Sequence, residues 1–135
     1  MEYKDINLAQ LGVIASEIAQ TLTVGDIILL QGELGTGKTT FVILLCEQLK
    51  VKDIVNSPSY VLLNEYMGDL PIFHYDLYRL SSSEEAFELG ILDRLTDGVT
   101  IIEWPNLIKN YLPKKRINIF LEHCGENRNI SIDRV

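Results

Sequence analysis

Long apolar runs, paired cysteines and positive charge are all scarce in this 135-residue sequence. No apolar run approaches the roughly 20 residues that a membrane-spanning helix needs, so we expect no membrane partner. The first 20 residues carry three acidic side chains and no signal-like apolar core, which makes the cytoplasm the expected compartment. The length is typical of one domain, and we expect residues 1–135 to form a single unit.

Cysteine and histidine each occur twice, and neither forms a metal-ligand pattern. Cys46 lies in an apolar stretch and is expected to be a small core residue. Cys124 is distant in sequence, and a cytoplasmic compartment disfavours a disulfide between the two. His74 and His123 have no ligand-spaced partners, which argues against a zinc site.

The formal net charge is −7, which argues against binding nucleic acid by neutralising its phosphates. One small basic cluster, residues 114–116, is expected to be a set of solvent-exposed charges at the start of a strand. We therefore expect little direct binding of nucleic acid.

Apolar spacing predicts an α/β chain in which helices and strands alternate. Helices are expected over residues 7–22 with Asn7 as N-cap, over 38–49, and briefly within 81–90. The first helix is expected to bury an apolar stripe of Leu8, Leu11, Ala15, Ile18 and Leu22, which Ile14 broadens. Strands are expected at 26–31 and 99–104, apolar on both faces as in a parallel sheet covered by helices. Antiparallel hairpins are expected at 60–67 with 71–77 and at 116–123 with 129–135.

Residues 32–39, "GELGTGKT", satisfy the phosphate-loop pattern G-x-x-x-x-G-K-[ST]. The glycines let backbone N–H groups approach phosphate oxygens, and the following helix points its positive end at the same anion. Lys38 is expected to reach the β- and γ-phosphates, and the Thr39 hydroxyl to bind Mg²⁺. The loop residues expected to contact a nucleoside triphosphate are Gly32, Glu33, Leu34, Gly35, Thr36, Gly37, Lys38, Thr39 and Thr40. The pattern predicts a P-loop NTPase-like domain with a central, mostly parallel sheet flanked by helices.

Two carboxylates end apolar strands, Asp76 in "IFHYDLYRL" and Glu103 in "TIIEWP". Mg²⁺ is usually held by one or two carboxylates together with phosphates and water. Either residue could bind the metal or orient a water molecule, and the alternative is a surface carboxylate at a strand end. Trp104 follows Glu103 directly and either faces the crevice or packs in the core.

The segment "NSPSY" lies between the loop's helix and the first hairpin. Hydroxyls at Ser57 and Ser59 could sense the γ-phosphate as switch segments do, or could belong to a plain Ser-Pro turn. Arg79 could stabilise transferred phosphoryl charge or pair with a nearby glutamate.

Five stretches, "GELGTGKTTF", "SPSYVLLNEY", "HYDLYRL", "EEAFELGILD" and "IIEWP", together resemble the TsaE family in order and spacing from about residue 30 to 105. That family comprises small bacterial ATPases required for the threonylcarbamoyladenosine (t6A) modification of tRNA. The resemblance implies ATP and Mg²⁺ as cofactors and weak hydrolysis by the chain alone. It also implies binding to the two subunits of the threonylcarbamoyl-transferase complex, of TsaB and TsaD type, which hold most of the tRNA.

The resemblance also assigns roles to single residues. It implies Lys38 on the phosphates, Thr39 on Mg²⁺, and Asp76 and Glu103 as metal-site and catalytic carboxylates. Trp104 matches a functional tryptophan beside the ATP. The family usually has threonine where this chain has Ser59, and serine keeps the hydroxyl but loses a methyl group.

Three other classes share the phosphate loop. A small-molecule kinase would need a clamp for its phosphoryl acceptor, and the chain has only five arginines, none clustered in a lid-like segment. A GTP-binding switch would need an N-K-x-D element, which is absent. A module that binds nucleotide without turnover would release no phosphate.

Overall fold

The computed structural model describes residues 1–58 and 60–134, and it is built around one seven-stranded mixed sheet. In chain order the elements are β1 (Glu2–Ile6), α1 (Leu8–Thr21), β2 (Ile27–Gln31), α2 (Lys38–Gln48), β3 (Leu63–Met67), β4 (Pro71–Asp76), α3 (Ser83–Glu88), β5 (Val99–Glu103), two 3₁₀ turns (Pro105–Leu107 and Lys109–Tyr111), β6 (Ile117–Cys124) and β7 (Asn127–Arg134). The strand order is β1-β7-β6-β2-β5-β4-β3. The four central strands, β6-β2-β5-β4, are mutually parallel, and antiparallel strands extend the sheet at both edges.

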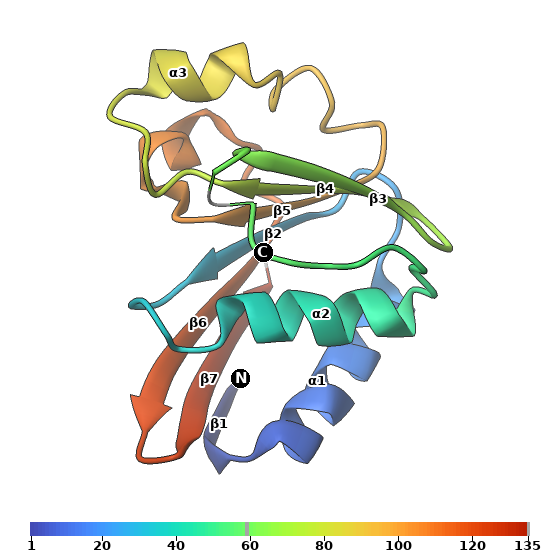
Figure 1. Ribbon diagram of the computed structural model, residues 1–135, viewed down its shortest axis with the longest axis vertical. Helices are drawn as coiled ribbons and strands as arrows, with labels where there is room; N and C mark the ends of the chain where they lie inside the picture. Colours follow the sequence, from blue (N-terminus) through green and yellow to red (C-terminus); the bar gives the residue numbers. More distant parts are fainter. Residues whose placement is uncertain (59, 135) are drawn as a thin grey trace.

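Helices cover both faces of this sheet, which explains why the central strands are apolar on both sides. Helices α1 and α2 pack side by side on one face, and α3 lies on the other side of the molecule (Figure 1). The larger core lies between the sheet and the α1–α2 pair and includes Leu11, Phe41 and Ile101. The smaller core lies under α3 and the 3₁₀ turns and includes Leu29 and Ala86.

Local sequence signals place most of the element ends where they were predicted. Asn7 caps α1 through a capping box, in which its side chain and that of Gln10 bond each other's backbone N–H groups at 2.9 and 2.8 Å. Ser82 caps α3, and Gly90 follows it in the left-handed region with φ 78°. The expected α/β fold is therefore confirmed in its helices and in the parallel centre of its sheet.

Two expectations need correction at the amino terminus. Residues 2–6 form β1, an edge strand that pairs antiparallel with β7, although the sequence analysis assigned no strand there. Leu8 was expected in the buried stripe of α1 but is 55% exposed; it is the first residue of the helix, and the buried stripe begins one turn later at Leu11.

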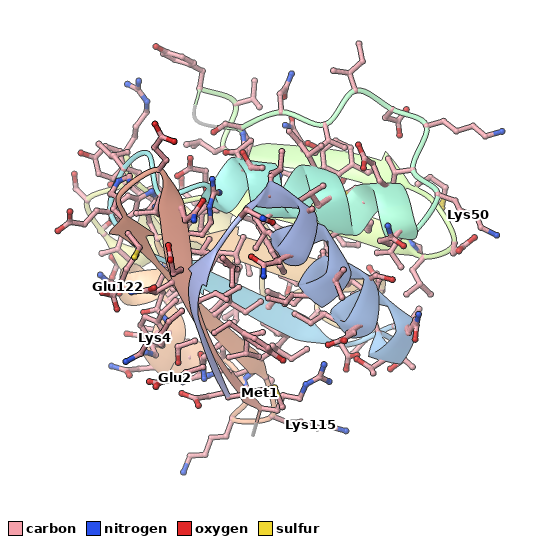
Figure 2. All side chains as sticks on the ribbon, turned by 90° about the horizontal axis from the view of Figure 1, so that it is seen from below. Met1, Glu2, Lys4, Lys50, Lys115 and Glu122 are labelled. Carbon is pink, nitrogen blue, oxygen red and sulfur yellow. The ribbon has the colours of Figure 1, made fainter. Side chains whose placement is uncertain are left out.

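The sheet edge formed by β1, β7 and β6 has one face that α1 and α2 do not cover. Glu2, Lys4 and Glu122 are exposed and lie on the side of the sheet turned away from these two helices (Figure 2). No helix among the described residues is long and apolar enough to cross a membrane.

Candidate nucleotide site

The predicted phosphate loop connects the end of β2 to the first residue of α2, as the pattern requires (Figure 1). Gly32 has φ 148°, and a Cβ atom there would lie 2.4 Å from the carbonyl oxygen of Leu121 in β6. Only glycine combines this backbone angle with such a close approach of the neighbouring strand. The loop is thus shaped partly by its contact with β6.

Gly37 is the N-cap of α2 and has φ 95°. It offers no side-chain acceptor to the first N–H groups of the helix, so no side chain competes with an anion for the positive helix end. A Cβ atom on Gly37 would lie 1.9 Å from Nη1 of Arg128, a residue of β7. The loop's last glycine therefore lies directly against a cation.

Lys38 is buried, with 6% of its surface exposed, and its ammonium group is held by the loop itself. Its Nζ donates to the carbonyl oxygens of Gly32 and Glu33, the latter at 3.2 Å. The same atom lies 3.8 Å from the centroid of the Trp104 ring, a cation–π contact. Burial lowers the pKa of Lys38, and the charges of Glu103 and Asp76 partly offset this effect. A bound polyanion would supply the charge compensation that this buried ammonium group has only in part.

Asp76 and Glu103 meet at the carboxyl ends of two neighbouring parallel strands. They are register partners between β4 and β5, and both are buried. Asp76 Oδ1 accepts from the backbone N–H of Tyr78 at 3.0 Å, and its Oδ2 lies 3.5 Å from the Ser57 hydroxyl. In open α/β sheets the crevice beyond the carboxyl ends of the strands is where ligands bind.

A cavity of about 290 Å³ unites the loop with these carboxylates. Its lining residues are Leu34, Gly35, Gly37, Lys38, Thr39, Thr40, Ser57, Asp76, Glu103 and Trp104. Three further loop residues, Gly32, Glu33 and Thr36, line a neighbouring cavity of about 620 Å³ over β6 and β7. Residues from four separate segments of the chain thus surround one site.

Trp104 is turned toward this cavity by an unusual backbone conformation. It has φ 57° and ψ 60°, in the left-handed region, immediately before the 3₁₀ turn that Pro105 begins. Its ring lies 4.8 Å from that of Tyr78 and faces the Lys38 ammonium group. Of the two sequence interpretations, the crevice position matches the geometry better than a core position does.

Of the remaining switch candidates, Arg79 is not brought into this cavity. Arg79 is exposed, and its guanidinium group lies 4.3 Å from the ring centroid of Tyr60, outside the cavity lining. Ser59 lies outside the described residues. A role for either residue in sensing or stabilising phosphate stays a prediction.

The donor set suits Mg²⁺ better than a softer metal. Thr39, Asp76 and Glu103 present only oxygen atoms to the cavity, and Mg²⁺ prefers a few protein oxygens together with phosphates and water. Among the described residues no group of three or more His, Cys, Asp and Glu side chains is arranged to hold a metal ion by itself. Any metal here would rely on the nucleotide for further ligands.

Three residues that the fold brings to the site were not predicted from the sequence. Nε2 of His123 lies 3.5 Å from the Leu34 carbonyl, and Arg128 contacts Gly37, both from the β6–β7 hairpin. His74 contacts Glu103 from β4. The only available signal for His74 was its position in the apolar run two residues before Asp76, and the hairpin residues gave none.

Known proteins resemble the chain over nearly its whole length. The family model described as "Threonylcarbamoyl adenosine biosynthesis protein TsaE" matches residues 7–130. A Bacillus subtilis protein named "tRNA threonylcarbamoyladenosine biosynthesis protein TsaE" is 35% identical over 129 residues, which is 94% of this chain and 80% of the relative. Proteins of the same name from Rickettsia felis and Nostoc are each 39% identical, over 87% and 81% of this chain and 70% of each relative.

The fold comparison agrees with the sequence comparisons. The crystal structure of Bacillus subtilis YdiB superposes with a TM-score of 0.80 at 32% identity and covers 100% of this chain and 85% of that one. Because both the family model and relatives above 30% identity span most of the sequence, the chain belongs to the TsaE family of threonylcarbamoyl adenosine biosynthesis proteins.

Proposed function

We propose that this chain binds ATP with Mg²⁺ in the cavity at the end of β2 and hydrolyses it to support t6A formation on tRNA. The observation that carries the proposal is the convergence of Lys38, Asp76 and Glu103 on one cavity at the start of α2. Backbone N–H groups, a helix N-terminus and a buried lysine favour a polyphosphate, and two carboxylates beside them favour its metal.

Thr39, Asp76 and Glu103 are the residues that would hold Mg²⁺, directly or through its waters. When bound, the metal would neutralise part of the negative charge of the triphosphate. The chain's own residues do the rest: Lys38 binds the phosphates, the α2 N-terminus orients them, and a carboxylate orients the attacking water. In the reaction the water oxygen bonds to the γ-phosphorus, the bond from that phosphorus to the bridging oxygen breaks, and the proton lost by the water passes to the phosphate products or to solvent, which leaves ADP and inorganic phosphate.

The place of this activity in t6A formation rests on the relatives, which are named as tRNA t6A biosynthesis proteins. We propose that the chain acts in the cytoplasm on the two transferase subunits, of TsaB and TsaD type. A formal net charge of −7 favours a protein partner over direct tRNA binding. The single P-loop domain would then act as a nucleotide-driven accessory to those subunits.

Nucleotide titration of a lysine variant tests the site directly. Trp104 lies beside the Lys38 ammonium group, so its fluorescence should report MgATP binding to the wild-type protein. Lys38→Ala should weaken MgATP binding at least about 100-fold, because charge-assisted contacts to phosphate are lost in a buried site.

Lys115→Ala is the matched control for that variant. It removes the same charge from an exposed position before β6, at the amino ends of the parallel strands and away from the cavity (Figure 2). It should bind MgATP like the wild type. Unchanged affinity in Lys38→Ala, or equal losses in both variants, would refute the loop assignment.

A further inference from the structure

His74 is a polar side chain that is buried in the middle of β4. None of its surface is exposed, and its Nε2 lies 2.6 Å from Oε2 of Glu103, which is 2% exposed. A buried imidazole facing a buried carboxylate is costly unless the two form a hydrogen bond. This contact is short enough to be a charge-assisted one.

The register of the sheet produces this pairing. His74 pairs with Ile101 and Asp76 pairs with Glu103 between the parallel strands β4 and β5. Because side chains alternate along a strand, His74 and Asp76 share one face, and His74 lies one step deeper in the sheet. Asp76 and Glu103 line the cavity, whereas His74 does not. The imidazole therefore lies behind Glu103 and acts on the cavity only through it.

The surroundings of the ring fix which nitrogen donates. Nδ1 is buried and has no hydrogen-bond partner among the described residues, so a proton there would be left unsatisfied. An ionised carboxylate only accepts, so the proton of the short contact belongs on Nε2. The ring also packs near Tyr66, at 6.2 Å between centroids, whose hydroxyl donates to the Asn56 carbonyl at 3.1 Å. The imidazole is thus hydrogen-bonded to Glu103 and has a fixed tyrosine ring as a neighbour.

We propose that His74 is a positioning residue that holds Glu103 by donating from Nε2 to Oε2, which leaves Oε1 for the contents of the cavity. This inference rests on the proposed function, because it assigns Glu103 a task at the ATP site. A fixed carboxylate orients a water or a metal-bound water better than one free to rotate. His74 touches neither substrate nor metal and is not a catalytic residue.

Two variants of His74 separate positioning from packing. His74→Gln keeps a donor, because the amide nitrogen of glutamine is as many bonds from Cα as Nε2 of histidine is. His74→Leu keeps apolar bulk but removes the donor. Phosphate release by both variants would be measured as kcat and KM for MgATP with the transferase subunits present, together with the Tm of each variant.

The expected result is a loss in kcat alone. His74→Leu should lower kcat about 10- to 100-fold with KM within about threefold of wild type, as for other residues that orient a ligand, and His74→Gln should restore most of it. In a protein that already carries Glu103→Gln, adding His74→Leu should lower kcat no further. Full kcat in His74→Leu, or equal losses in both variants with lowered Tm, would overturn the inference.

A second readout does not depend on turnover. In nitrogen NMR of the histidine rings, His74 should carry its proton on Nε2, and Glu103→Ala should change that signal. A proton on Nδ1, or a signal indifferent to Glu103, would overturn the positioning role even if hydrolysis occurs. Absence of hydrolysis by the wild type with the expected NMR result would instead refute only the proposed ATPase activity.

Discussion

Burial controls the chemistry of the two cysteines at the scale of single residues. Cys46 is 1% exposed within α2, and burial raises the pKa of its thiol from 9.0 to about 12. Cys124 lies at the end of β6, is half-buried, and its Sγ lies 3.8 Å from Oδ1 of Asp5. The thiolate is the reactive form, so the two side chains should react very differently.

We predict that a thiol-reactive chromogen at pH 8 modifies one cysteine in the native protein and both after unfolding. In a Cys124→Ser variant the native protein should show almost no reaction. The raised pKa also means that Cys46 stabilises the fold fully below pH 9 and that this contribution is lost between pH 9 and about 12. Rapid native modification of Cys46 would contradict its burial.

Local sequence patterns were enough to predict most of the residues that line the cavity, but not the histidine that contacts Glu103 from behind it. Lys38, Thr39, Asp76 and Glu103 follow from a motif and from strand ends, which are local patterns. The contact between His74 and Glu103 depends on how β4 and β5 align, and no local pattern encodes that register. From the sequence, His74 was considered only as a metal ligand and set aside for lack of ligand-spaced partners.

At the scale of elements, the turn from β2 into α2 depends on backbone that only glycine adopts. Gly37 has φ 95°, and an added Cβ would meet Arg128 of β7. The β6–β7 hairpin thus holds the phosphate loop from the side opposite to β4 and β5. Its residues were predicted as strands, but their contact with the loop could not be, because strand order is set by the whole sheet.

A pair of glycine substitutions tests this view of the loop. Gly37→Ala should destabilise the protein by about 1–2 kcal/mol through left-handed strain, and should also weaken MgATP binding. Gly12→Ala is the matched control, since it lies in α1 with nothing within 4 Å of the added Cβ. It should stabilise the protein by about 0.5–1 kcal/mol and leave binding unchanged. Urea unfolding and Trp104 fluorescence measure both effects, and equal behaviour of the two variants would contradict the account.

At the scale of the whole molecule, the sheet places the residues of the candidate site at the carboxyl ends of its central parallel strands. Parallel strands β2, β4 and β5 end together, so a loop, two carboxylates and a tryptophan meet there. The parallel centre was predictable from doubly apolar strands, whereas the pairing of β1 with β7 was not, because β1 is short, polar and exposed along most of its length. Polar edge strands carry too little apolar pattern to be identified.

The formal net charge of the chain bears on the kind of partner it binds. A formal net charge of −7 disfavours binding tRNA by neutralising its phosphates, so we expect the effect of the chain on tRNA modification to pass through partner proteins. Those partners should therefore change the rate at which the chain turns over ATP.

The most direct test of the central claim follows the γ-phosphate of ATP. Phosphate release should be slow with Mg²⁺ and the chain alone and faster once the two transferase subunits are added, and Glu103→Gln should lower it in both conditions without removing it. Phosphate transferred to a small molecule would instead indicate a kinase. No release under any of these conditions would contradict the ATPase and leave a module that only binds nucleotide.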